Sequence, residues 1–337
     1  MGRFFGPTPN IISAEGFFRG SAGTTTRTWS QVTTGFESTG EFFFCSFANG
    51  LYLITYQSGT VSSVITSSDL VTFTKHNIAA AANYTPRSVA FGASTYFTVL
   101  DNNPTAFGIH GYTSPDLVTW TLRATGFPAT AANQRVFLPV FGNGVFLLVS
   151  QESAAYATSP TGVTWTQRST YVPNNWGQPI FDGSKFVAAV MGSANTPKIA
   201  TSTDGVTWTE STATLGAAFT AGPVPFFVGN DGTGQYIAGE SHDDSGDSLN
   251  GALTTVTAFS FSDSGNATGS SPVWSGGSWA RSNANNADLA SSTNGLTWHQ
   301  DTVPATAHFW NNIAFGSKFI VVGGDNSGHN MLASRSA

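Results

Sequence analysis

The residues that could do chemistry are mainly aspartates that recur in one short motif. Ser-x-Asp-Gly-x-Thr-Trp is most complete at residues 202–208 and recurs, with changes, at 67–73, 114–120, 159–165 and 292–298. At a tight turn, Asp or Asn accepts backbone hydrogen bonds and Gly supplies positive φ. We therefore expect these residues to hold hairpins and to do no catalysis. The residues assigned this structural role are Asp69, Asp116, Asp204, Asn294, Trp120, Trp165, Trp208 and Trp298.

Other constellations that could support catalysis or bind metal are weak. The six His residues lack metal-ligand spacing, and there is no Gly-x-Ser-x-Gly motif or phosphate-binding loop. The one acidic cluster, 241–247, contains Asp243 and Asp244. Clustered carboxylates with Gly can hold Ca²⁺, but this spacing is not that of an EF-hand, and a solvated loop is the simpler interpretation. We predict no catalytic residues and no metal ligands.

The aromatic residue of each motif marks a long internal repeat. The intervals between successive aromatics are 44, 47, 45, 43 and 90 residues, and the last is twice 45. A period of roughly 40–50 residues with several strands per unit is typical of a β-propeller. The aromatics are Trp29, Phe73, Trp120, Trp165, Trp208 and Trp298.

The repeat predicts an all-β, seven-bladed propeller with four-stranded antiparallel blades. The last unit has only three strands of its own, so we expect an N-terminal strand within 24–34 to complete it and remove its open edge. The propeller then spans 24–337 and leaves residues 1–23 as an N-terminal arm. The predicted blades are 36–76, 87–123, 135–168, 176–210, roughly 219–264, roughly 271–300, and 308–335 with 24–34.

Composition excludes several classes of protein. Only 9% of the 337 residues are charged and the net charge is −6, so a nucleic-acid binder is not expected. The chain has 38 Ser and 44 Thr, which suits strands and turns better than helices. The single cysteine, Cys45, excludes an internal disulfide, and we expect it to be buried. No apolar stretch is long enough to span a membrane, and no signal peptide is evident.

The repeated motif resembles the Asp-box (BNR repeat) of sialidase-like propellers. In that family the motif joins the outer two strands of a blade, on the face away from the active site. Sialidases also use an arginine triad and a Tyr nucleophile paired with Glu. Here only Arg87 and Arg135 precede predicted innermost strands, and a third matching Arg is not evident. The resemblance therefore implies the fold but not the enzyme.

A ligand site is expected on the face opposite the Asp-box turns. Exposed aromatic rings stack on sugars, and neighbouring polar groups bind the hydroxyls. For the two Trp residues the alternative is packing between blades. The predicted ligand-binding residues are Trp176, Trp310, Arg87, Arg135, Asp243 and Asp244.

The motif and composition also resemble those of bacteriophage virion appendages. We expect a non-enzymatic tail, fibre or capsid protein, made in the host cytoplasm and located in the virion. Its partners would be other virion proteins, bound through the Phe pairs of residues 1–23, and host-surface glycans. The alternatives are a lectin-like propeller of a bacterial surface and, less favoured, a sialidase-like glycosidase. No cofactor is expected unless the acidic cluster binds Ca²⁺.

Overall fold

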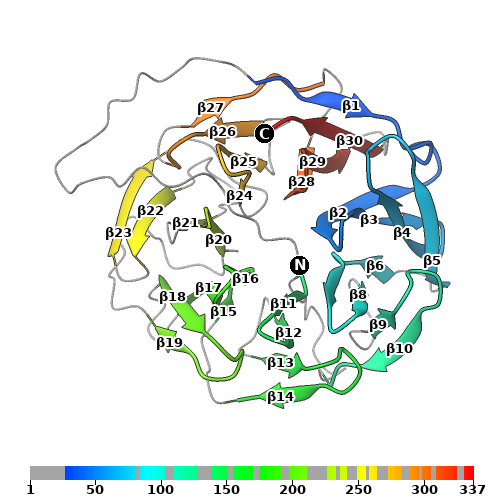
Figure 1. The fold of residues 1–337 in the computed structure, drawn as a ribbon, viewed down its shortest axis with the longest axis horizontal. Helices are drawn as coiled ribbons and strands as arrows, with labels where there is room; N and C mark the ends of the chain where they lie inside the picture. The colour runs from blue at the N-terminus through cyan, green and yellow to red at the C-terminus, as the bar shows by residue number, and fades with distance from the viewer. Residues whose placement is uncertain are drawn as a thin grey trace.

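A ring of β-sheets surrounds a central axis in the computed structural model (Figure 1). The structure describes residues 27–80, 84–102, 110–126, 138–150, 155–169, 175–191, 197–210, 226–232, 236–240, 249–255, 258–263, 272–282, 289–295, 298–304, 309–324 and 330–337. Every regular element among them is a strand, so the prediction of an all-β propeller is confirmed. No helix in this described part is long and apolar enough to cross a membrane.

The strand pairings of the described residues form seven antiparallel sheets, numbered here as blades in chain order. Blade one contains β2 (Glu41–Ala48), β3 (Leu51–Ser58), β4 (Val61–Ser67) and β5 (Thr74–Ala80). Blade two contains β6 (Tyr84–Pro86), β7 (Ala90–Gly92), β8 (Thr95–Asn102), β9 (His110–Ser114) and β10 (Thr121–Ala124). Blade three contains β11 (Val140–Gly142), β12 (Val145–Val149), β13 (Tyr156–Ser159) and β14 (Thr166–Arg168).

The remaining blades continue around the ring. Blade four contains β15 (Asn175–Trp176), β16 (Ile180–Phe181), β17 (Phe186–Met191), β18 (Pro197–Ser202) and β19 (Thr209–Glu210). Blade five contains β20 (Phe226–Asn230), β21 (Tyr236–Glu240), β22 (Leu249–Thr255) and β23 (Ala258–Asp263). Blade six contains β24 (Val273–Trp274), β25 (Trp279–Ser282), β26 (Leu289–Ser292) and β27 (His299–Gln300). Blade seven joins β28 (Phe309–Phe315), β29 (Phe319–Gly324) and β30 (Asn330–Arg335) to β1 (Ser30–Val32).

The predicted blade construction needs correction. Six blades are built entirely from consecutive strands, and only the remaining sheet combines the two ends of the chain. Blades two and four have five strands instead of four, because their innermost strand breaks into two pieces that both pair with the second strand. The closing strand β1 takes up only part of 24–34: it pairs with β30 from Ser30 to Val32.

The core of the described residues lies between blades, in clusters that join neighbouring sheets. One cluster joins blades three and four through Tyr156, Trp176 and Phe186. Another joins blades six and seven through Trp310 and Phe319. Strands buried on both faces are rich in apolar residues without strict alternation, which explains the continuous apolar runs in the sequence.

Short turns between the first and second strands bring adjacent blades into close contact near the axis. A Cβ at Gly142 of blade three would overlap the ring of Phe181 of blade four, so only glycine fits there. The equivalent contacts are Gly316 with Phe47 and Gly92 with Phe141. We call these three contacts the glycine–aromatic collar.

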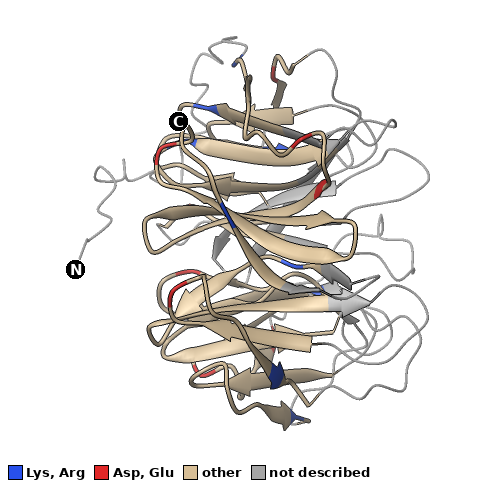
Figure 2. Ribbon diagram, turned by 90° about the vertical axis from the view of Figure 1, so that its right-hand side faces the viewer, with Lys and Arg blue, Asp and Glu red and all other residues tan. Residues whose placement is uncertain are grey.

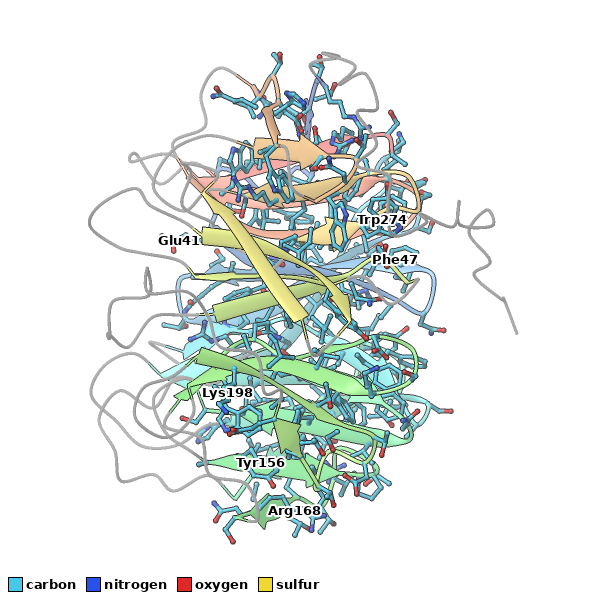
Figure 3. All side chains as sticks on the ribbon, turned by 90° about the vertical axis from the view of Figure 1, so that its left-hand side faces the viewer. Glu41, Phe47, Tyr156, Arg168, Lys198 and Trp274 are labelled. Atoms are coloured by element: carbon cyan, nitrogen blue, oxygen red, sulfur yellow. The ribbon has the colours of Figure 1, made fainter. Side chains whose placement is uncertain are left out.

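The ring has two different faces. Turns between the first and second strands and between the third and fourth strands lie on one side, here called the turn face. The connections from second to third strands and from blade to blade leave on the other side, the loop face. Figure 3 shows this division, with Phe47 and Trp274 on the turn face and Glu41 and Lys198 on the loop face.

Candidate functional site

The most complete Asp-box turn is held by its own carboxylate. In blade four, Asp204 Oδ1 accepts hydrogen bonds from the backbone N–H of Val206 at 2.8 Å and of Thr207 at 2.7 Å. Ser202 Oγ donates to the same oxygen at 2.9 Å and accepts from Gly205 N–H at 2.8 Å. Four polar groups of a tight hairpin are therefore satisfied within the motif, as a structural role requires.

The turns of blades one and two repeat this geometry. Asp69 Oδ1 accepts from the N–H groups of Val71 and Thr72 at 2.8 and 2.9 Å. Asp116 Oδ1 accepts in the same way from Val118 and Thr119, at 2.9 Å each. The backbone hydrogen bond from Thr72, followed by that from Val71, lowers the pKa of Asp69 below its usual value. The pKa of Asp116 is lowered in the same way. Both carboxylates are thus held in their ionised form.

The less complete motifs keep part of this arrangement. Thr161 replaces the Asp in blade three, and its Oγ1 accepts from Val163 N–H at 3.3 Å. Asn294 accepts from Ser292 Oγ at 3.1 Å in blade six. The ring N–H of the motif Trp donates to the carbonyl three residues earlier; the three such bonds are Trp120 to Leu117, Trp165 to Gly162, and Trp298 to Gly295. Trp208 instead packs its ring 4.9 Å from that of Trp176.

Acidic residues colour several turns along the left side of the disc in Figure 2, which is the turn face. Their contacts are to the backbone and side chains of the fold, so these carboxylates act as framework acceptors. A general acid or a nucleophile needs an accessible group whose pKa suits the proton transfer. Lowered pKa values and filled hydrogen-bond sites at Asp69 and Asp116 favour the framework role.

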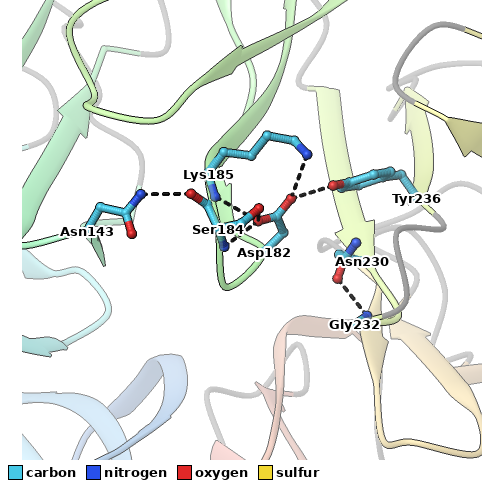
Figure 4. A network of polar contacts seen from close by, with 7 residues as sticks. All are labelled: Asn143, Asp182, Ser184, Lys185, Asn230, Gly232 and Tyr236. Atoms are coloured by element: carbon cyan, nitrogen blue, oxygen red, sulfur yellow. Dashed lines mark hydrogen bonds and ion pairs between the residues drawn. The ribbon is translucent and has the colours of Figure 1, made fainter. Parts of the chain in front are cut away.

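A second polar network links the inner turns of blades three, four and five (Figure 4). Asp182 accepts from the N–H groups of Ser184 and Lys185 at 2.8 Å each, and Lys185 Nζ lies 3.4 Å from its other oxygen. The hydroxyl of Tyr236, from blade five, donates to that same oxygen. Asn143 of blade three donates to the Ser184 carbonyl at 2.7 Å. The network therefore ties three consecutive blades together.

The Tyr236–Asp182 pair invites comparison with a tyrosine nucleophile, but its electrostatics oppose that role. Burial, and then the hydrogen bond to Asp182, raise the pKa of the Tyr236 phenol well above its usual value. Burial alone would raise the pKa of Asp182, but its hydrogen bonds, led by the one from Tyr236, lower it overall. A phenol held protonated by an ionised carboxylate is a poor nucleophile. The pair fits a structural link between blades.

The structure corrects the predicted role of the two tryptophans. Trp176 is 1% exposed and Trp310 is 0% exposed, so neither ring offers a face to a sugar. Trp176 packs 5.3 Å from the ring of Tyr156 between blades three and four. Trp310 belongs to the cluster between blades six and seven. Both Trp residues sit on innermost strands, where the neighbouring blade covers them.

Of the other predicted ligand residues, the structure describes Arg87. It lies between β6 and β7 and is half-buried, with its guanidinium 5.3 Å from the centroid of the Phe44 ring. Arg135, Asp243 and Asp244 lie outside the described residues, as does the arm 1–23. Within the described ranges no group of three or more His, Cys, Asp or Glu side chains is placed to hold a metal ion.

The sequence reading missed the residues that join blades through polar contacts. Asp182-Gly183 is readable as a turn, but its partner Tyr236 comes from the next repeat and no local pattern connects them. A buried carboxylate at Asp301, between blades six and seven, was also missed. Its only sequence signal is its position three residues after the motif Trp298, directly after β27, where blades one to three carry His or Arg.

Solved structures with the same architecture include proteins with different activities. YCF48 from Cyanidioschyzon merolae is 17% identical, with a TM-score of 0.62 over 92% of this chain and 99% of that one. A streptogramin B lyase is 9% identical, with a TM-score of 0.65 over 93% and 99%. The Hadza microbial sialidase Hz136 is 13% identical, with a TM-score of 0.51 over 86% and 74%.

These similarities show the fold alone, because all three identities are low. No family model matches the chain, and no curated protein matches it. The chain therefore shares its propeller architecture with solved proteins that include a sialidase. The neighbours comprise enzymes, such as the lyase, as well as YCF48, which was also solved bound to a D1 peptide.

Proposed function

We propose that this chain is a non-enzymatic binding propeller of a bacteriophage virion, displayed on a tail, fibre or capsid. The proposal that the chain is not an enzyme rests on the role of its described carboxylates, which stabilise turns. Asp69, Asp116, Asp182 and Asp204 all accept hydrogen bonds from the framework. Support for the virion part comes from the composition, which is rich in Ser and Thr and poor in charged residues, and from the resemblance of the repeats to those of phage appendages.

The loop face is the proposed binding surface. Several turns on the opposite face are closed by their own hydrogen bonds. On the loop face, by contrast, β8 ends at Asn102 and β9 begins only at His110, and β19 ends at Glu210 and β20 begins only at Phe226. Binding residues are disproportionately carried by such connections on a rigid scaffold. A host-surface glycan is the proposed ligand, because hydroxyl- and amide-rich segments suit hydrogen bonding to sugars.

A glycan array with the purified chain tests the ligand. We expect binding that Arg87→Ala weakens, because Arg87 lies between β6 and β7, the two pieces of an innermost strand. Arg168→Ala is the matched control, since Arg168 is an outer-strand arginine that bonds Thr158 of its own blade. Equal loss in both variants, or release of sugar from a fluorogenic sialoside, would contradict the proposal.

The arm, residues 1–23, is the proposed attachment to other virion proteins. Exchanging its two Phe pairs, Phe4-Phe5 and Phe17-Phe18, for Ser removes the apolar area available for docking. We expect such a variant to fold, as judged by circular dichroism, but to be missing from purified particles. Normal incorporation would place the anchor elsewhere, and absence of the wild-type chain from any particle would refute the virion role.

A further inference from the structure

Blade seven is the one sheet of the described structure whose third and fourth strands share no covalent turn. In blade four, for comparison, β18 ends at Ser202 and β19 begins at Thr209, and the Asp-box turn joins them. In blade seven, β30 ends at Arg335 and its partner β1 begins at Ser30, at the other end of the chain. The closing strand must therefore be held without the Asp-box turn that joins the outer strands of blades one to four and six.

A buried carboxylate occupies this seam. Asp301, which follows β27 of blade six, accepts a hydrogen bond from Trp29 Nε1 at 2.8 Å and from Ser291 Oγ at 2.5 Å. Arg335 Nε lies 3.6 Å from it, and both of these side chains are almost completely buried. One side chain thus contacts the N-terminal segment, the C-terminal strand and the preceding blade.

The other blades show what is unusual about Asp301. The residue equivalent to Asp301, three places after the motif aromatic, contacts a third-strand Thr in each of blades one to three. These pairs are His76 with Thr66, Arg123 with Thr113, and Arg168 with Thr158. In blade six this position is a carboxylate bonded to Ser291. A carboxylate can also accept a hydrogen bond from the ring N–H of Trp29. The equivalent Trp residues of blades two, three and six donate instead to a carbonyl of their own turn.

The segment that Asp301 holds is short and has defined limits. At its start, Thr302 N–H donates to the Arg27 carbonyl at 2.7 Å, and Trp29 N–H donates to the Thr302 carbonyl at 2.8 Å. Its ladder to β30 contains only three residue pairs. Just beyond it, the ring of Phe36 packs 6.1 Å from that of Tyr56, which fixes the following chain to blade one.

We propose that residues 27–32 form a clasp that opens and closes as a unit, with Asp301 as its lock, while the other blades stay folded. Local opening occurs where few backbone pairs and few buried contacts hold a segment. The clasp has three ladder pairs and no covalent turn, so its closure depends on the contacts that converge on Asp301 and Trp29. Opening exposes the outer edge of β30.

Hydrogen exchange measured by mass spectrometry on the full chain tests the clasp. In the wild type, amides of 27–32 should exchange faster than those of β5, the outer strand of blade one. Asp301→Asn, which keeps the shape but removes the charge, should raise exchange at 27–32 about tenfold or more, since hydrogen bonds to charged groups are the stronger ones. Asp204→Asn is the matched control and should leave 27–32 unchanged.

An engineered disulfide keeps the test decisive even if Asp301→Asn fails to fold. Ser30 and Ser334 are directly paired across the ladder, so Ser30→Cys with Ser334→Cys can form a disulfide between β1 and β30. The native Cys45 should not compete, because it is buried and burial raises the pKa of its thiol. Oxidation should slow exchange at 27–32 without changing blades one to four, and reduction should reverse this. Exchange that is unaffected by the disulfide, or that rises equally in all blades in Asp301→Asn, would overturn the proposal.

Discussion

At the scale of single residues, the motif Asp contributes stability by accepting from its own turn. Asp204→Ala removes the acceptor for the N–H groups of Val206 and Thr207 in a hairpin. We expect a loss of roughly 1 kcal/mol or slightly more in the free energy of unfolding, measured by urea denaturation. Asp204→Thr should cost less, because Thr161 plays this part in blade three. An unchanged midpoint for Asp204→Ala would contradict the structural role.

The same carboxylates make the fold sensitive to acid. Asp69 and Asp116 have folded-state pKa values below the unfolded value of about 3.9. Their contribution is therefore fully present above that unfolded value and is lost as the pH falls through the lower folded-state value. Thermal melts between pH 5 and pH 2 should show a decline that is shallower in an Asp69→Asn/Asp116→Asn variant. An identical decline in both proteins would show that other groups are responsible.

The residue scale also shows where sequence reading stops. The motif predicted that Asp204 faces its own turn, because the acceptor and the donors are within a few residues. It did not predict whether Trp176 faces the axis or the neighbouring blade. On an innermost strand both surroundings suit an indole ring, and the partners that cover Trp176, such as Tyr156 and Trp208, come from two different repeats.

At the scale of elements, the contact between successive inner turns sets how closely blades pack. Gly142 leaves room for the ring of Phe181, so Gly142→Ala forces a ring or a backbone to move. We expect a loss of about 1–3 kcal/mol in chemical denaturation, as for other overpacked sites. Gly277→Ala is the control, because nothing lies near its added methyl group, and it should change stability by less than about 0.5 kcal/mol. Similar losses in both variants would refute the collar's role.

Aromatic pairs across several inner turns show what the sequence does reveal about elements. The rings of Phe141 and Phe146 lie 4.6 Å apart across the turn of blade three, and those of Phe91 and Tyr96 lie 4.6 Å apart in blade two. This spacing recurs along the chain, so the second strand of each repeat could be predicted. The split inner strands of blades two and four could not, because their interruption depends on contacts with neighbouring blades. Gln178 illustrates this, since it bonds the backbone of Leu138 in blade three.

At the scale of the whole molecule, the sequence period was sufficient to predict the propeller architecture. It was not sufficient to predict the contacts at blade seven, where the two ends of the chain meet. A repeat of about 45 residues requires each unit to bury its faces against the next, and this arrangement closes into a ring. The pairing of β1 with β30 follows from counting strands in the last repeat. Asp301 does not follow from any count, because it is needed only at the one junction where chain ends meet.

The non-covalent join at blade seven means that the ring has no intrinsic first repeat. A chain in which Ala337 is joined to Arg27 through an Asp-box-like turn, and which is cut instead between Asp204 and Gly205, would contain the same cyclic order of strands. Such a circular permutant should fold, because breaks at exposed turns are well tolerated. Its circular dichroism spectrum should match that of the parent without residues 1–26, and an insoluble or unfolded permutant would contradict this. The genetic order of the repeats is thus free to rotate around the ring, with Trp29 gaining the turn carbonyl that it now lacks.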